Sequence, residues 1–346
     1  MDICPQCPAF HRRNFAVDKN YPMQVILGSG GAISWPLATE LANYTNHVRC
    51  CSRTPHELPA APGVVYEHTP LDLLDRDATK QAVTGATVIY LTAGLAYRTK
   101  VWQRDWPVVI DNVLAACTAA NAKLVFFDNV YALNPTEYGR MTEQSPLQPT
   151  SAKGRVRKAV LDKIWAAHRA GEVTACVARS ADFYGPEVSS GLLNSLVLDK
   201  IAGGEKPMWI GDPDARHSFT YTPDAGRFTA LLGNDDRAWG QTWNLPTAGP
   251  AWTVREWADR AGAQVGRNVK LFRMPKALFW LLGRFNADLR ELWDVRAQFA
   301  GDYVFDSSRF QQMFGEQPTA YATGLAACLK HRSSSPIPAP ATSQNR

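Results

Sequence analysis

The sequence lacks any run of about 18 apolar residues, so no segment is predicted to cross a membrane as a helix. It also lacks a basic stripe, because most of the net charge of +5 lies in residues 1–22 and 330–346. Nucleic acid is therefore not predicted as a partner. Residues 1–22 have no central apolar run, which argues against a secretory signal and predicts a loose extension before Met23. The Ser/Pro/Ala-rich residues 331–346 are predicted to form a disordered tail.

The cysteines lack the paired spacing of a disulfide framework. There are seven, an odd number, and Cys117 and Cys176 lie in apolar runs. This pattern predicts reduced thiols and a cytoplasmic location. Cys4 and Cys7 have the spacing of metal ligands, but no second pair accompanies them, so no metal site is predicted.

The sequence does contain an alternation of short apolar runs with longer helical stretches. The predicted strands are Met23–Leu27, His47–Cys51, Val64–Tyr66, Thr87–Leu91, Lys123–Phe127 and Val173–Ala178. The predicted helices cover 32–44, 74–84, 102–120 and 153–170. This alternation predicts an α/β fold, with a Rossmann-type doubly wound parallel sheet forming a dinucleotide-binding domain over residues 23–180.

After residue 180 glycine and proline become frequent and the predicted strands are shorter. Strands are expected at Pro207–Ile210, Ser218–Thr222 and Gln241–Leu245, and helices at 190–202, 223–233, 253–264 and 319–330. Residues 181–330 are therefore predicted to form a smaller substrate-binding cap at the carboxyl ends of the sheet. The stretch Met274–Gly283 is apolar nearly all round, which favours core or a subunit interface in a homodimer. A membrane-surface helix is the alternative.

A glycine-rich turn follows the first predicted strand directly, as Gly28-Ser-Gly-Gly-Ala-Ile-Ser34. A strand, a glycine turn and a helix in this order are typical of dinucleotide binding. Gly28 permits a tight turn, and Gly30 or Gly31 lets the backbone approach a pyrophosphate. The following helix directs its free N–H groups at that anion.

With this turn, the chain resembles the extended epimerase/dehydratase branch of the short-chain dehydrogenase/reductase superfamily. The family pattern G-x-x-G-x-x-G corresponds here to Gly28, Gly31 and Ser34, and Phe183-Tyr-Gly-Pro186 resembles the family's Tyr-Gly-Pro motif. The resemblance covers roughly residues 23–330. It implies a nicotinamide dinucleotide cofactor held by Gly28, Gly30, Gly31, Ala32, Ile33, Asp72, Leu73, Thr92, Ala93, Gly94 and Asn112.

The end of the second predicted strand indicates which dinucleotide is used. An acid here would bind the ribose 2′-hydroxyl of NAD, but the strand ends in Ser52 and Arg53. A guanidinium with a neighbouring hydroxyl can meet a 2′-phosphate. We therefore expect NADP to be preferred, with NAD possible; the alternative is that Arg53 is a solvated loop residue.

The catalytic pattern of the family is not kept. The family uses Ser or Thr after the fifth strand and Tyr-x-x-x-Lys on the next helix, whereas Asn129, Lys153 and Arg157 stand at these places. Because Lys153 and Arg157 are four residues apart, they share a helix face. We expect Arg157 to bind the ribose hydroxyls, Asn129 to bind a carbonyl oxygen, and Lys153 or Tyr131 to supply the proton. The alternative is that the basic residues are simply a charged helix surface.

The substrate candidates lie in the second half. His217 stands where sugar-nucleotide epimerases carry a diphosphate-binding arginine, and Asp182 and Tyr184 are expected near it. These substitutions favour an NADP-dependent oxidoreductase acting on a small carbonyl or alcohol. The alternatives are a sugar-nucleotide epimerase or dehydratase, and a redox-inactive NADP-binding regulatory protein.

Overall fold

The computed structural model describes residues 22–188 and 191–334. Most of the predicted N-terminal extension, and the tail from residue 335 on, lie outside these ranges. Within them, no helix is long and apolar enough to span a membrane. The same ranges contain no group of three or more His, Cys, Asp or Glu side chains that could hold a metal.

A parallel sheet of seven strands forms the centre of the larger part, in the order β10-β6-β5-β4-β1-β2-β3. The strands are β1 (Met23–Leu27), β2 (His47–Ser52), β3 (Val65–Pro70), β4 (Ala86–Leu91), β5 (Lys123–Asp128), β6 (Ala175–Arg179) and β10 (Thr242–Asn244). Every residue of β1 is buried, as expected for a parallel strand covered on both faces. β2 pairs with β1 on one side and β4 pairs with β1 on the other, so the order in which strands are added to the sheet reverses at β1. Parallel sheets bind ligands in the crevice at such a reversal. The predicted α/β Rossmann-type fold is confirmed.

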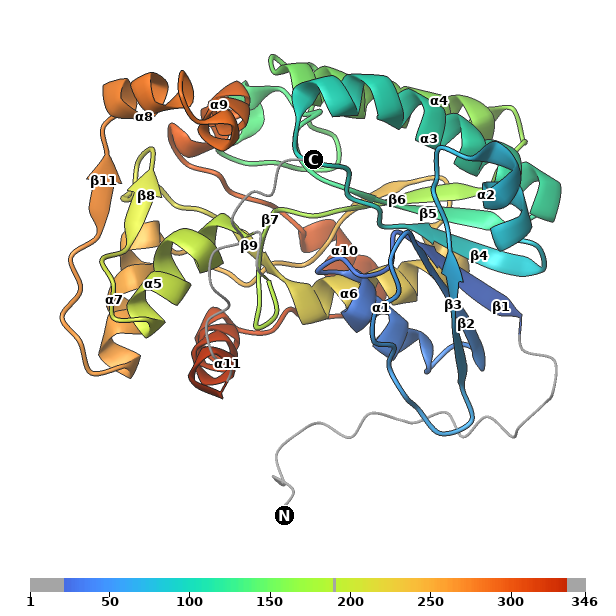
Figure 1. Ribbon diagram of the computed structural model, residues 1–346, viewed down its shortest axis with the longest axis horizontal. Coiled ribbons are helices and arrows are strands. Elements are labelled where there is room, and N and C mark those ends of the chain that lie inside the picture. The colour runs from blue at the N-terminus through green and yellow to red at the C-terminus, as the bar shows by residue number, and fades with distance from the viewer. Residues whose placement is uncertain (1–21, 189–190, 335–346) are drawn as a thin grey trace.

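Helices cover both faces of this sheet (Figure 1). One face carries α2 (Arg76–Ala82), α3 (Thr99–Ala120) and α4 (Ala152–Arg169), and the other carries α1 (Ser34–Leu41), α6 (Thr222–Gly233) and α10 (Ser308–Phe314). The helices α1 and α6 touch closely because Gly226 has no side chain. A Cβ there would lie 2.5 Å from Pro36 Cβ.

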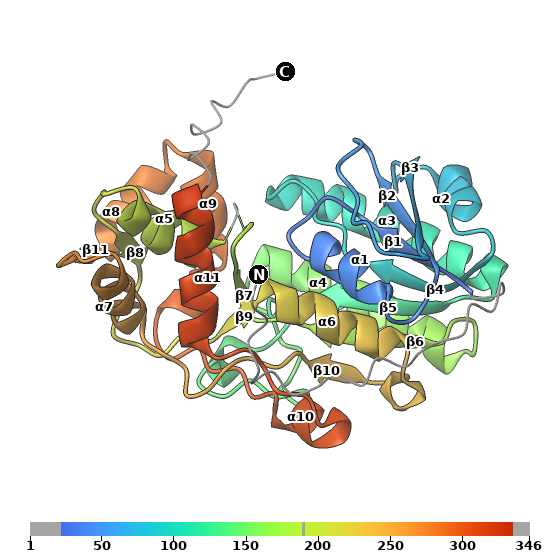
Figure 2. The ribbon, with the colours of Figure 1, turned by 90° about the horizontal axis from the view of Figure 1, so that it is seen from below.

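The smaller part gathers at one end of the sheet (Figure 2). It holds two parallel strand pairs, β7 (Asp182–Tyr184) with β9 (Phe219–Tyr221), and β8 (Met208–Ile210) with β11 (Phe272–Met274). Its helices are a π-helical turn (Asn194–Leu198), α5 (Asp199–Ala202), α7 (Val254–Gln264), α8 (Lys276–Gly283), α9 (Ala287–Asp294) and α11 (Tyr321–Ser334). Because β6 leads straight into β7, this part lies at the carboxyl ends of the sheet.

The packing does not divide at residue 180. Although α6 and β10 follow that residue, β10 pairs with β6 and α6 packs on the main sheet, so the chain returns to the first part after β9. A division drawn from glycine and proline frequency does not detect this return. Likewise, α11 continues to Ser334, past the predicted start of the tail.

Candidate active site

The glycine loop after β1 makes close backbone contacts. Gly28 and Gly30 have φ angles of +93° and +97°, and a Cβ on Gly28 would lie 2.2 Å from Ala93 Cα. Ser34 closes the loop, because its hydroxyl accepts from Gly30 N–H at 2.8 Å and donates to Gly31 C=O at 2.7 Å. A serine in place of the third glycine therefore fixes the turn that presents backbone N–H groups. Ala32 and Ile33 lead from the loop into α1.

The loops after β3 and β4 lie at the same edge of the sheet. Asn112 donates its amide N–H groups to Leu73 C=O at 2.9 Å and Leu74 C=O at 3.2 Å, which fixes the loop that carries the exposed Asp72. Thr92 N–H donates to Leu27 C=O at 2.9 Å, and the exposed Gly94 follows Ala93. The structure thus brings the predicted dinucleotide-binding residues together, with Asn112 acting on the loop through the backbone.

Two histidines that the sequence analysis missed lie next to Ser52 at the end of β2. Ser52 Oγ lies 2.9 Å from His68 Nε2 and 3.3 Å from His56 Nδ1, and the two rings meet edge to face with centroids 5.4 Å apart. Burial and the neighbouring His56 lower the pKa of His68. His68 is next to Ser52 only through the pairing of β2 with β3, so sequence spacing gives no sign of it. Arg53 is exposed beside this group.

Lys153 is fully buried at the start of α4. Its ammonium donates to Thr99 Oγ1 at 3.0 Å, to Glu291 C=O at 3.1 Å and to the Glu291 carboxylate. An ammonium has three donors, and all three are used here. The side chain therefore ties α4 to α9, and its expected role as proton donor stays a prediction that this pairing disfavours.

Arg157 is buried under the carboxyl end of β5. Its guanidinium donates to Asp128 Oδ1 at 2.9 Å and to Phe127 C=O at 3.0 Å, and lies 4.7 Å from the centre of the Trp106 ring. Lys153 and Arg157 are thus internal side chains, unlike the charged surface considered as the alternative. A ribose contact by Arg157 stays a prediction, and it would require some of these contacts to be exchanged.

Two tyrosine hydroxyls meet beside Lys153. Tyr131 Oη lies 3.0 Å from Tyr97 Oη, and the Lys153 ammonium lies 4.5 Å from the centre of the Tyr97 ring. Asn129 Oδ1 accepts from Tyr131 N–H at 3.0 Å and so fixes the turn after β5. Burial, with a further contribution from Asp182, raises the pKa of Tyr131 to about 12, and burial also raises that of Tyr97. Both phenols are protonated at physiological pH, as a phenol of ordinary pKa also is, and the raised pKa values further disfavour their phenolate forms. Tyr97, on the loop after β4, is the residue at this site that the sequence analysis missed.

The predicted substrate residues separate into two environments. His217 Nε2 lies 3.0 Å from Asp182 Oδ2, and its buried ring stacks between Phe219 and Tyr303. Tyr184 is fully buried in the core of the smaller part, so its expected contact with substrate stays a prediction that this burial disfavours.

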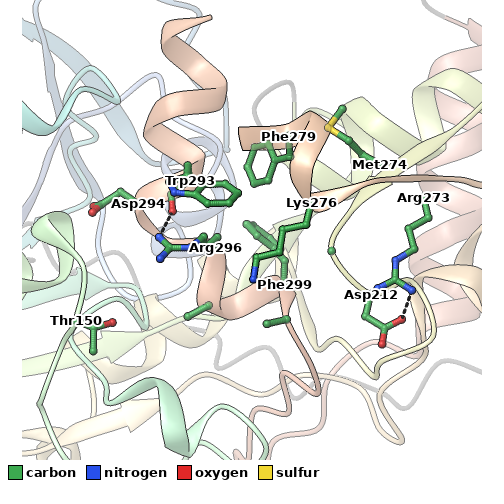
Figure 3. A pocket seen from close by; sticks show the side chains of 13 residues that line it. Thr150, Asp212, Arg273, Met274, Lys276, Phe279, Trp293, Asp294, Arg296 and Phe299 are labelled. Atoms are coloured by element: carbon green, nitrogen blue, oxygen red, sulfur yellow. Dashed lines mark hydrogen bonds and ion pairs between the residues drawn. The ribbon is translucent and has the colours of Figure 1, made fainter. Parts of the chain in front are cut away.

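A cavity of about 440 Å³ lies between α8, α9 and the N-terminus of α4 (Figure 3). Its walls include three basic side chains, Arg273, Lys276 and Arg296, and three aromatic ones, Phe279, Trp293 and Phe299. Asp294, also in the wall, accepts from Ala152 N–H at 3.0 Å and Lys153 N–H at 3.1 Å. The cavity therefore adjoins the helix turn that carries Lys153. The apolar stretch Met274–Gly283, which holds α8, was recognised from sequence, but the cavity was missed because β11 and α9 were not predicted as elements.

Comparison with known proteins places this geometry in a family. Residues 24–245 match the model of the NAD dependent epimerase/dehydratase family. No curated protein matches.

Solved structures share the fold at low sequence identity. UDP-N-acetylglucosamine 4-epimerase from Bacillus cereus is 15% identical with a TM-score of 0.69, over 90% of this chain and 95% of that chain. MoeE5 in complex with UDP-glucose and NAD is 19% identical with a TM-score of 0.71, over 90% and 98%. The dTDP-glucose 4,6-dehydratase DesIV from Streptomyces venezuelae, as a double mutant with NAD bound, is 17% identical with a TM-score of 0.69, over 90% and 97%. On the family match, this chain belongs to the NAD dependent epimerase/dehydratase family.

Proposed function

We propose that this protein is an NAD(P)-dependent enzyme that acts on a nucleotide-activated sugar by epimerisation or dehydration. The observation that carries the proposal is the cationic, aromatic-walled cavity beside α4, in a chain whose glycine loop fits a dinucleotide. The family match and the titles of the similar structures favour this over the small-carbonyl oxidoreductase expected from sequence.

The cavity has the chemistry that a nucleoside diphosphate requires. Lys276 and Arg296 can pair with phosphate oxygens, while Arg273 is partly balanced by Asp212 at 4.0 Å. The aromatic walls can take the flat face of a base. Because His217 is held by Asp182, anion binding in this proposal falls to these cations instead.

The proton chemistry falls to Tyr131. A nicotinamide dinucleotide, when bound at the glycine loop, accepts or returns a hydride. In the step that returns the hydride, Tyr131 would donate its phenolic proton to the substrate oxygen, and in the step that removes the hydride its phenolate would accept the hydroxyl proton. The raised pKa of Tyr131 favours the protonated form, and Tyr97 Oη lies 3.0 Å from its hydroxyl. The phenol that the family carries on the helix is thus supplied here from the loop after β5.

The β2 end supports a preference for NADP. Arg53, Ser52, His56 and His68 form a group of donors where a 2′-phosphate would be recognised. Protonation of His68 adds a positive charge for that anion, so the preference for NADPH over NADH increases as the pH falls through the lowered pKa of His68.

A redox-inactive regulatory protein remains the second candidate. It is favoured by Lys153 and Arg157, which stand where the family carries Tyr and Lys and are held in internal ion pairs with Glu291 and Asp128. The two candidates differ in turnover, which only the enzyme has.

Calorimetric titration of UDP and dTDP tests the substrate site. We expect one molecule to bind, and Lys276→Gln to weaken binding roughly 10–150-fold, the range for a hydrogen bond to a charged group. Lys158→Gln is the matched control, because Lys158 lies on α4 and pairs with Asp162 outside the cavity. Absence of binding to the wild-type protein would reject the nucleotide-sugar assignment. Chromatographic detection of an epimerised or dehydrated nucleotide sugar, after incubation with NAD⁺ or NADP⁺, then separates enzyme from sensor, because the hydride is returned in each turnover and leaves no net change in absorbance at 340 nm.

A further inference from the structure

The helix α8 presents an apolar face to solvent. Leu278, Leu281 and Leu282 follow i, i+3, i+4 spacing and therefore share one side of the helix, and Phe285 lies in the turn that follows Gly283. Their exposed fractions are 37%, 48%, 37% and 85%. Trp280, at 49%, lies beside them, and we call these five residues the α8 face. The buried residues of the helix are Phe279 and Gly283, so α8 is amphipathic with its larger apolar side outward.

The segment that carries the α8 face is basic, and Asp288, the exposed acidic residue that follows it on α9, pairs with Arg98 at 2.7 Å. Residues 267–287 contain five basic residues and no acidic residue. Lys270 and Arg284 are exposed, and the Arg284 guanidinium lies 5.6 Å from the centre of the Trp280 ring. In Figure 1, α8 lies at the upper edge of the smaller part, and the exposed fractions of its apolar side chains show that they face solvent. The surface offers apolar contact and positive charge together.

We propose that the α8 face docks on the surface of an anionic lipid bilayer. Apolar residues flanked by lysine and arginine suit the boundary between headgroups and acyl chains. An eight-residue helix is about 12 Å long, so α8 can lie in that boundary but not cross it. A second copy of the chain is the poorer occupant, because a two-fold axis through the α8 face would bring the exposed Arg284 of both copies into one interface.

Docking would bring the cavity to the membrane. The same helix contributes Lys276 and Phe279 to the cavity wall, as Figure 3 shows. Bilayer docking does not depend on the proposed reaction, and either can fail without the other.

Vesicle flotation with the full chain tests the proposal. The protein is expected to float with vesicles of phosphatidylglycerol and phosphatidylcholine in equal parts, to bind phosphatidylcholine alone weakly, and to dissociate as salt rises. The double variant Leu281→Asp/Phe285→Asp should no longer float. Val65→Asp, which changes an exposed apolar residue on β3, is the matched control and should bind like the wild type.

A second variant isolates the charge. Because each basic residue near an anionic surface strengthens binding about fivefold, Lys270→Gln/Arg284→Gln should weaken it roughly 30-fold. Failure of the wild type to float, or flotation unchanged in Leu281→Asp/Phe285→Asp, would overturn the proposal. So would light scattering that shows a dimer which this variant converts to monomer, since the α8 face would then be a contact between copies.

Discussion

Replacing Glu291 by glutamine is expected to destabilise the protein far more than loss of a surface ion pair. Lys153 is fully buried and the Glu291 side chain is 14% exposed, so Glu291→Gln leaves a buried ammonium without its counter-charge. Breaking a buried pair in this way costs about 3–5 kcal/mol. Partial exposure of Glu291 places the expected loss near the lower end, ~3 kcal/mol. The control is Asp162→Asn, which breaks the exposed Lys158–Asp162 pair and should cost about 0.3–0.5 kcal/mol.

Urea unfolding of the wild type, Glu291→Gln, Lys153→Met and the double variant measures the coupling directly. We expect Lys153→Met/Glu291→Gln to be more stable than Glu291→Gln alone, because no unpaired buried charge remains. Equal losses for Glu291→Gln and Asp162→Asn would refute the reasoning. Burial alone would raise the pKa of Glu291, but hydrogen bonds from Lys153 and Thr99 outweigh it and lower the pKa below 4.5. The contribution of the pair is therefore complete above pH 4.5 and disappears as the pH falls through the lowered pKa.

Three further outcomes are expected. Tyr131→Phe should lower turnover of an identified substrate roughly 10²–10⁴-fold, and unchanged turnover would remove its role as proton donor. Tyr97→Phe, which removes the hydroxyl 3.0 Å from Tyr131, should shift the pH profile of turnover, whereas a purely structural role would lower stability and leave that profile in place. NADPH should bind roughly 10–150-fold tighter than NADH to the wild type. This ratio of affinities should fall in Arg53→Ala, and its increase at lower pH should be lost in His68→Gln. Equal affinities for the two dinucleotides in the wild type would contradict the NADP preference.

The parallel sheet and the glycine loop could be predicted because their signals are local. The strands β1, β4, β5 and β6 are mainly short apolar runs, whereas β3 (Val65–Pro70) is largely polar and was predicted only over Val64–Tyr66; Gly28 directly follows β1. In the smaller part β8 and β9 were predicted, whereas β7 and β11, with three residues each and no periodicity, were missed. The return of β10 to the main sheet depends on packing rather than on its own residues.

The side-chain partners could not be predicted because they come from distant segments. Lys153 and Glu291 are 138 residues apart, and only the packing of α9 against α4 brings them together. Helical spacing correctly put Lys153 and Arg157 on one face, but it could not tell whether that face meets a cofactor or the protein interior. The Tyr97–Tyr131 pair depends in the same way on loops from two different strands meeting at one edge.

Titration of NADH and NADPH into Gly31→Val tests the central claim most directly. Gly31 is exposed, and a Cβ there would meet only Gly28 C=O at 3.9 Å, so the variant should fold while its side chain occupies the space that a pyrophosphate needs. Gly28 is unsuitable, because a Cβ at that position would clash with Ala93 in the protein itself. Gly139→Val, at an exposed glycine with nothing within 4 Å, is the control. We predict that the wild type and Gly139→Val bind a dinucleotide and that folded Gly31→Val binds neither; equal binding by all three proteins would contradict the assignment of the loop.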